Sequence, residues 1–378
     1  MFSIHNAALV TKSVSKQRIQ KALKIVHERT IKLSRCLSTS NTNEVSSYKP
    51  ARSKKITSLT LSHKKRKSQK ITMVTAYDYP SALHVDRAGI DVLLVGDSCA
   101  MVELGYPTTQ PITMTEMLHH CKAVHRGIMA GDGNGPLLVA DMPLGTYELN
   151  PETSLKNAYQ FIKEAGMDAV KLEGGTKSRA ETVQKITQDG GIAVMGHVGL
   201  TPQAISVIGG FRAQGRTAKR AREILDDALR LQDAGAFALV LECVPGNVAK
   251  IVTETLEIPI IGIGAGGDCD GQVLVYHDML GMSSHPHHEQ FVPRFCKSYA
   301  NVGNIIQNGL ESFKNEVESS KFPGEGQYSP YHMPESEQIQ FEQLLKQDEG
   351  QRRLYREKLS KELKDKDEYE AIGLYGPK

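Results

Sequence analysis

The sequence predicts an α/β protein folded as a (β/α)8 TIM barrel. Eight short apolar runs rich in β-branched residues, most of them ending in a polar residue or glycine, alternate with amphipathic helical patterns over about 210 residues. Near-continuous apolar strands that alternate with helices indicate a parallel sheet whose outer face is covered. Eight such units suit a closed barrel, which typically takes ~250 residues. An open doubly wound sheet is the alternative, because residues 264–272 are too few for an ordinary helix before the eighth strand.

The expected strands follow the apolar runs. In chain order they are Ile71–Ala76, Asp91–Gly96, Leu137–Ala140, Asp168–Leu172, Ile192–Gly196, Phe237–Leu241, Pro259–Ile263 and Val273–Tyr276. The helices between them carry apolar residues at helical spacing. They are expected at Tyr79–Ala88, Thr115–Met129, Glu152–Ala165, Ser178–Gln188, Ala218–Asp233 and Gly246–Leu256.

Charge divides the chain into unlike parts. Residues 1–70 carry 17 basic and 2 acidic side chains, whereas residues 71–378 carry 29 basic and 41 acidic ones, so the net +3 of the whole chain combines +15 with −12. We expect a targeting extension at residues 1–50, a single catalytic barrel domain at 51–324 and a charged helical extension at 325–378.

The N-terminal extension has the composition of a mitochondrial transit peptide. Ile19, Leu23 and Val26 recur at helical spacing, the opposite face is basic, acidic residues are scarce, and a Ser/Thr-rich stretch follows at residues 38–42. These features predict a location in the mitochondrial matrix, with a disordered basic arm as the alternative. The later basic run Lys64–Lys67 is expected to be a solvated helix face rather than a nuclear localisation signal.

The part beyond the barrel is expected to be helical. A helical pattern covers Gln290–Val317, and a highly charged one covers Glu335–Ala371. For the charged run we expect a solvated tail or an oligomer contact.

Composition excludes several classes of partner. The acidic body disfavours nucleic acid, because an acidic surface repels phosphate. No apolar stretch approaches the ~18 residues that a membrane span requires, so we expect no membrane partner. The six cysteines include no CxxC pair, which favours a reducing compartment over a disulfide framework.

Polar residues gather where the predicted strands end. In a barrel of this kind the catalytic groups project from the carboxyl ends of the strands. The residues found there are Asp97 and Ser98 after strand two, Asp141 after strand three, Lys171 and Glu173 at the end of strand four, His197 after strand five and Glu242 after strand six. One ring of acids with a lysine and a histidine indicates a catalytic site, although a single aspartate in such a place would more often cap a helix.

The acids of this ring predict a divalent cation. Crowded carboxylates repel one another and must either take up protons or find a cation. Oxygen ligands with neighbouring waters suit Mg²⁺, which favours one or two carboxylates and a bidentate substrate. The candidate ligands are Asp97, Asp141 and Glu173.

The other charged groups have two interpretations each. Lys171 shares a strand face with Glu173, so an ion pair or a contact to a substrate carboxylate is favoured over Schiff-base chemistry. Glu242 ends a wholly apolar strand, and burial there would raise its pKa to a value that suits a general base acting on a carbon acid. An ion pair of Glu242 with Arg212 or Arg216 is the structural alternative, and His197 is a second candidate base.

The strand ends and the segments around them resemble the ketopantoate hydroxymethyltransferase (3-methyl-2-oxobutanoate hydroxymethyltransferase) family. The matching stretches occur in the family's order and together are highly specific. They are Thr75–Tyr79, Leu94–Ser98, Ala140–Pro143, Val170–Gly175, Gly196–Gln203, Gln214–Arg216, Leu239–Pro245 and Gly262–Gly266. The basic run Lys64–Lys67 also belongs to the enzyme by this resemblance.

The resemblance implies both a reaction and a site. The implied reaction transfers a hydroxymethyl group from 5,10-methylenetetrahydrofolate to 3-methyl-2-oxobutanoate, giving 2-dehydropantoate in the first step of pantothenate synthesis. Asp97 and Asp141 would hold Mg²⁺ with Glu173 nearby, and Glu242 would accept the proton. The residues expected to bind substrate are Asp97, Ser98, Asp141, Lys171 and His197. The family also implies a homo-oligomer, a decamer in bacteria.

Two other functions remain open at the level of the sequence. A Mg²⁺-dependent lyase acting on a 2-oxoacid would share the metal and the enolate but need no folate. A non-catalytic oligomeric scaffold would need none of the acids, so the intact ring argues against it.

Overall fold

The computed structural model describes residues 54–131, 134–282, 293–324, 328–329, 331–347 and 349–371. The chain divides into two compact units, one up to Val273 and one from Leu274 onward, and each is described by itself. The expected transit peptide at residues 1–50 lies outside the described residues.

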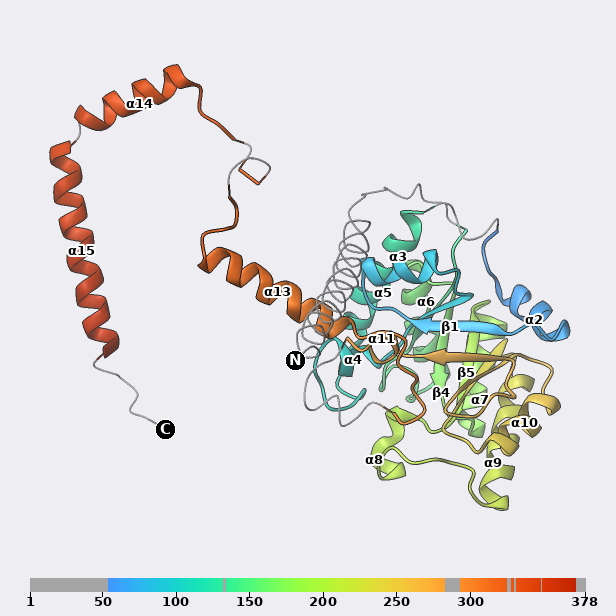
Figure 1. Ribbon diagram of the computed structural model, residues 1–378. Coiled ribbons are helices and arrows are strands. Elements are labelled where there is room, and N and C mark those ends of the chain that lie inside the picture. The colour runs from blue at the N-terminus through green and yellow to red at the C-terminus, as the bar shows by residue number, and fades with distance from the viewer. Residues whose placement is uncertain are drawn as a thin grey trace, which may run out of the picture. The chain divides into compact units, whose positions relative to one another are not determined.

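Eight parallel strands close into a barrel in the order of the sequence, which confirms the predicted fold (Figure 1). The strands are β1 Ile71–Thr75, β2 Val92–Val95, β3 Leu137–Asp141, β4 Ala169–Glu173, β5 Ala193–Gly199, β6 Ala238–Glu242, β7 Ile260–Ile263 and β8 Gly271–Leu274. The amide of Ile71 donates to the carbonyl of Asp270, 3.0 Å away, where β1 meets the start of β8. The eighth strand begins two residues earlier than expected, and β7 runs into it through a loop without a helix.

Helices lie outside the strands, close to the predicted ranges (Figure 1). They are α3 Tyr79–Arg87, α5 Met114–Met129, α6 Pro151–Lys163, α7 Lys177–Gln184, α9 Ala218–Asp233 and α10 Gly246–Thr255. Side-chain caps set several of the starts: Asp78 accepts from the amide of Ser81, and Thr113 forms a capping box with Glu116. The expected helix Ser178–Gln188 is α7 followed by a π-helical turn at Lys185–Asp189.

The long connections also contain short helical pieces. These are α4 Cys99–Val102 after β2, and the 3₁₀ turn η2 Pro202–Ala204 with α8 Ile205–Ile208 after β5. The η2 turn brings Gln203, which is buried, to the carboxyl ends of the strands.

The barrel interior is filled by side chains from every strand, including Met73, Leu94 and Val139. Helix α2 (Ser58–Arg66) precedes β1, and its Leu61 belongs to the same core. Burial of these apolar groups is the main stabilising contribution to the barrel.

The basic run of α2 is only partly a solvated helix face, which corrects the expectation from the sequence. Lys64 Nζ lies 2.6 Å from Asp91 Oδ2, and the two side chains are 23 % and 8 % exposed. Lys65 Nζ lies 2.7 Å from Asp270 Oδ2. The two aspartates precede β2 and β8, so these lysines pair with acids at the amino ends of the strands, whereas Arg66 and Lys67 are exposed.

The second unit is helical, and its charged part begins at Glu335 and ends at Ala371, as predicted. It contains α11 Tyr276–Leu280, α13 Val302–Glu318, α14 Glu335–Gln347 and α15 Glu349–Ala371. Of the pattern expected at Gln290–Val317, residues 290–292 lie outside the described residues, residues 293–301 are irregular, and α13 forms the helix from Val302. The single charged run expected from Glu335 forms two helices. No helix in the described ranges combines the length and apolarity needed to cross a bilayer.

Candidate active site

The polar residues expected at the strand ends lie together at the carboxyl end of the barrel. Cross-strand register pairs Asp141 of β3 with Lys171 of β4, and Glu173 of β4 with His197 of β5. The five most buried members of the group are only 2–5 % exposed: Asp97, Asp141, Lys171, Glu173 and His197. Buried charges persist only when they are paired or bind an ion, so the group needs internal partners.

Lys171 provides the positive charge of the group. Its Nζ lies 2.7 Å from Asp141 Oδ1. Burial opposes the ammonium form, but Asp141, Glu173 and Asp97 outweigh burial and raise the pKa of Lys171 above its usual value. A lysine held protonated suits ion pairing and anion binding, and it is a poor nucleophile for Schiff-base formation.

The two aspartates meet directly. The backbone amide of Asp97 donates to Asp141 Oδ2 over 3.0 Å. Gly96 leaves room for Ser98 next to this pair, because a Cβ there would lie only 2.9 Å from Ser98 Oγ. Burial, and then the charge of Asp141, raise the pKa of Asp97 to about 7. An acid that resists ionisation beside a second acid is suited to receive a cation.

Asp97 and Asp141 alone could hold a Mg²⁺ ion. Asp141 Oδ1 is buried and has no hydrogen-bond partner in the described part of the chain apart from the ammonium of Lys171. No three His, Cys, Asp or Glu side chains in the described ranges are arranged to share one metal ion. Mg²⁺ requires only one or two carboxylates, with waters and substrate completing its shell, so the donor set of Asp97 and Asp141 is sufficient.

Glu173 has other partners close by. Its Oε2 accepts from the backbone amide of Gln203 over 3.0 Å, and its Oε1 lies 3.6 Å from His197 Nδ1. Burial, followed by the charge of Asp97, raises the pKa of Glu173 well above its usual value. A role for Glu173 as a third ligand therefore stays a prediction.

His197 connects the lysine to the acid at the end of β6. Its Nδ1 lies 3.2 Å from Lys171 Nζ, and its Nε2 lies 3.2 Å from Glu242 Oε2. Burial and then the charge of Lys171 lower the pKa of His197 well below its usual value, so the ring is neutral. Because the ammonium of Lys171 can only donate, Nδ1 is the acceptor and Nε2 carries the proton. Nε2 makes no aligned hydrogen bond within the described residues, so the contact with Glu242 is one of proximity.

Glu242 has the properties of a base. Its side chain is 16 % exposed, and burial raises its pKa to about 7, with the charge of Lys171 opposing the rise. The sequence left open an ion pair with Arg212 or Arg216. In the described residues Glu242 instead contacts the neutral ring of His197, which leaves the carboxylate without an ion-pair partner beside the buried group.

Ser98 has a partner that sequence reasoning did not assign. Its Oγ lies 2.8 Å from Oη of Tyr77, a fully buried residue that follows β1. Tyr77 belongs to one of the stretches matched to the family, but nothing in the sequence indicates that its hydroxyl group meets Ser98.

Gln203 and Tyr147 were also missed. Gln203 Nε2 donates to Asp97 Oδ2 over 2.9 Å and to the carbonyl of Met142 over 3.0 Å. Tyr147 Oη forms a short hydrogen bond with Gln203 Oε1 and accepts from the amide of Glu173. Gln203 lies in the η2 turn and Tyr147 in the loop before α6. In such connections no periodicity indicates which side chains turn inward.

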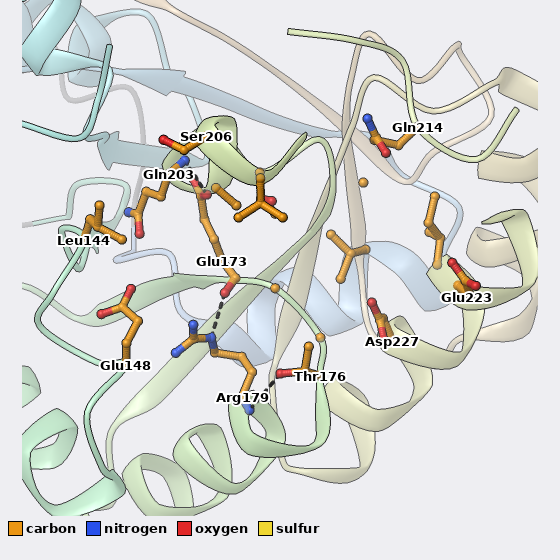
Figure 2. A pocket seen from close by; sticks show the side chains of 18 of the residues that line it. Leu144, Glu148, Glu173, Thr176, Arg179, Gln203, Ser206, Gln214, Glu223 and Asp227 are labelled. Atoms are coloured by element: carbon orange, nitrogen blue, oxygen red, sulfur yellow. Dashed lines mark hydrogen bonds between the residues drawn. The ribbon is translucent and has the colours of Figure 1, made fainter. Parts of the chain in front are cut away.

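A pocket of about 550 Å³ lies against this part of the site (Figure 2). Glu173 and Gln203 stand side by side in its wall, and Arg179 reaches Glu173 from α7. Arg179 Nε donates to the carbonyl of Glu173 over 2.7 Å, and the guanidinium lies 4.1 Å from the centre of the Tyr147 ring. Asp97, Asp141 and Glu242 are not among the residues that line the pocket, so Glu173, Gln203 and Tyr147 separate it from the aspartate pair.

Comparison with known proteins identifies the family. The chain is 55 % identical to "3-methyl-2-oxobutanoate hydroxymethyltransferase 1, mitochondrial" of Oryza sativa subsp. japonica over 74 % of each chain. It is 55 % identical to the protein of the same name from Arabidopsis thaliana, covering 74 % of this chain and 79 % of that one. A "3-methyl-2-oxobutanoate hydroxymethyltransferase" of Carboxydothermus hydrogenoformans is 50 % identical over 72 % of this chain and 94 % of its own. The sequence profile described as "Ketopantoate hydroxymethyltransferase" matches residues 55–325. The chain therefore belongs to the ketopantoate hydroxymethyltransferase family.

Proposed function

We propose that this protein transfers a hydroxymethyl group from 5,10-methylenetetrahydrofolate to 3-methyl-2-oxobutanoate, giving 2-dehydropantoate and tetrahydrofolate. The names of relatives at 50–55 % identity support this reaction. The observation that carries the mechanism is the buried group at the barrel mouth, where an aspartate pair, a protonated lysine and an acid with a raised pKa meet.

Substrate binding would use the charges of this group. Asp97 and Asp141 would hold Mg²⁺, and Lys171 and Ser98 would bind the carboxylate of the 2-oxoacid. When bound, Mg²⁺ supplies a Lewis acid that stabilises the negative charge developing on the keto oxygen as C3 loses its proton. The low exposure of Asp97, Asp141 and Lys171 keeps water away and strengthens these interactions.

Proton removal from C3 would fall to Glu242. Its pKa of about 7 leaves it ionised in a large fraction of molecules near neutral pH, yet basic enough to accept a proton. His197 Nε2 lies 3.2 Å from this carboxylate, and its proton would turn toward the ionised base and position it. His197 would therefore contribute to the substrate site by positioning Glu242.

Carbon transfer balances with one water molecule. The C3 carbanion forms a bond to the methylene carbon of the folate, water supplies the hydroxyl oxygen, and the two bonds from that carbon to nitrogen break. The C3 proton and one proton of water end on the two folate nitrogens.

The experiment that tests the function is an assay of purified protein with 3-methyl-2-oxobutanoate and 5,10-methylenetetrahydrofolate. We expect 2-dehydropantoate to form, to require the folate, and to stop when EDTA removes the metal. The alternative Mg²⁺-dependent lyase would cleave 2-oxoacids without folate, and it survives only if no 2-dehydropantoate forms.

Location and assembly extend the proposal. Residues 1–50 would direct the protein to the mitochondrial matrix, as the names of the plant relatives and the basic, helical pattern of the extension suggest. A reporter fused to these residues tests the proposed location. It should be imported into mitochondria, and replacing the basic side chains should abolish the import. We also propose a homo-oligomer, a decamer by resemblance to bacterial members, which light scattering of the purified protein tests.

A further inference from the structure

We propose that Gln203 is a positioning residue for the divalent cation, and that Tyr147 positions Gln203 in turn. The inference rests on the proposed function in one respect, which is that Asp97 binds the cation. It adds two residues that neither touch the reacting atoms nor carry charge.

The hydrogen bonds run in one direction only. The amide of Glu173 donates to Tyr147 Oη over 3.3 Å, so the tyrosine hydroxyl directs its own proton to Gln203 Oε1. The amide nitrogen of Gln203 then faces two acceptors, Asp97 Oδ2 and the carbonyl of Met142. With the amide turned around, its oxygen would face both acceptors, so Tyr147 and Met142 together fix the orientation.

The two positioning residues are themselves held firmly. Gln203 is 4 % exposed, its backbone amide donates to Glu173 Oε2, and its carbonyl accepts from Gln110 Nε2 over 2.9 Å. Tyr147 is 2 % exposed, and Arg179 both covers its ring and donates to its backbone carbonyl over 3.0 Å.

The consequence concerns how Asp97 presents its oxygens. Gln203 donates to Oδ2, and Oδ1 is the oxygen that Gln203 leaves for the cation. Mg²⁺ demands near-ideal octahedral geometry, so a carboxylate free to rotate binds it less well. Loss of such an outer partner typically lowers metal affinity by about 10–100-fold.

The test measures Mn²⁺ affinity, with Mn²⁺ as a spectroscopic substitute for Mg²⁺, by electron paramagnetic resonance of the free ion. We expect Gln203→Met to weaken binding by about tenfold or more, because methionine keeps the volume and the backbone bond to Glu173 but donates nothing to Asp97. Tyr147→Phe should weaken binding by a smaller factor. The double variant should match Gln203→Met, since Tyr147 acts through Gln203.

Matched controls separate positioning from general damage. Tyr159→Phe removes an exposed hydroxyl that reaches the carbonyl of Gly190. Gln232→Met removes a glutamine that bridges the amides of Glu257 and Ile258, away from the carboxylates. Both should bind Mn²⁺ as the wild type does. Raising the metal concentration should restore kcat in Gln203→Met with the substrate KM unchanged, which a misfolded site would not allow.

The outcomes distinguish this inference from the proposed function. Wild-type Mn²⁺ affinity in Gln203→Met overturns the role of Gln203, and additive losses in the double variant overturn the role of Tyr147. If Gln203→Met fails to fold, Tyr147→Phe alone still decides, because unchanged affinity there contradicts the relay. If the wild type forms 2-dehydropantoate but binds no Mn²⁺ or Mg²⁺, the metal site and this inference both fall while the reaction stands.

Discussion

His197 Nε2 lies 3.2 Å from Glu242 Oε2, and the two residues belong to the neighbouring barrel strands β5 and β6. The other ring nitrogen faces the ammonium of Lys171. A neutral histidine therefore places its single proton beside the acid proposed as the base, although Nε2 makes no aligned hydrogen bond within the described residues. This contact ties the geometry of Glu242 to the lysine that pairs with Asp141.

Replacement of His197 tests this link. We expect His197→Phe to slow removal of the C3 proton by about 10–100-fold, because the 3.2 Å contact would become a hydrogen bond to the ionised base, and such a bond is worth about 1.5–3 kcal/mol. Affinity for 3-methyl-2-oxobutanoate, measured by calorimetry in the presence of Mg²⁺, should change far less. An undiminished proton-removal rate would exclude His197 from positioning Glu242.

Lys171→Met should destabilise the protein and make its stability more dependent on metal. The substitution leaves Asp141 buried without its ion-pair partner, and breaking a buried pair costs about 3–5 kcal/mol. Urea unfolding with and without Mg²⁺ measures the effect. We expect Mg²⁺ to recover more stability in the variant than in the wild type. Equal recovery would mean that the ion does not share the site with the lysine.

The pH dependence follows from Glu242. Its pKa is raised to about 7, so the ionised fraction falls below pH 7, and the rate of C3 proton removal should drop by about tenfold for each unit of pH. Above pH 7 the rate should level off. A rate that continues to rise well above pH 7 would identify a different base.

The same raised pKa has a consequence for stability. The folded protein holds a proton on Glu242 that the unfolded chain has lost between about pH 4.5 and 7, so this group reduces stability as pH rises through that window. At pH 7.5 the free energy of unfolding of Glu242→Gln, measured by urea titration, should therefore exceed that of the wild type by about 1–3 kcal/mol. Equal stabilities at pH 7.5 would show that burial does not disfavour the ionised carboxylate.

The lysines of α2 should matter for stability rather than chemistry. Lys64→Met removes two contacts of 2.6 Å to the carboxylate of Asp91, which also accepts from Thr72, and we expect a loss of about 2 kcal/mol. Lys122→Met, which breaks an exposed contact of 3.5 Å to Glu164, should change stability by less than about 0.5 kcal/mol. Equal losses in the two variants would contradict the distinction.

The strands and the charged ring could be predicted because their signals are local. Each apolar run fixes a strand, and in a closed parallel barrel the residue that ends a strand must lie at one mouth. Asp97, Asp141, Lys171, Glu173, His197 and Glu242 were found in this way, and the structure brings them together. Their chemical roles remain proposals that the variants above examine.

The other site residues and ion pairs could not be predicted, because they depend on tertiary contacts. Gln203, Tyr147 and Tyr77 lie in connections whose path is set by tertiary contacts, so no period in the sequence shows that they turn inward. A basic run on a helix is usually solvated, but the acidic partners of Lys64 and Lys65 lie 27 and 205 residues further along the chain. Long-range pairing of this kind appears only once the barrel is closed.

The most direct measurement is exchange of the C3 hydrogen of 3-methyl-2-oxobutanoate with deuterium, followed by NMR in ²H₂O without folate. We expect exchange with the wild type and Mg²⁺, none after EDTA, and none with Glu242→Gln, although that variant should still bind the substrate. Absence of exchange with the wild type, or exchange at the wild-type rate in Glu242→Gln, would contradict proton removal from C3 by Glu242.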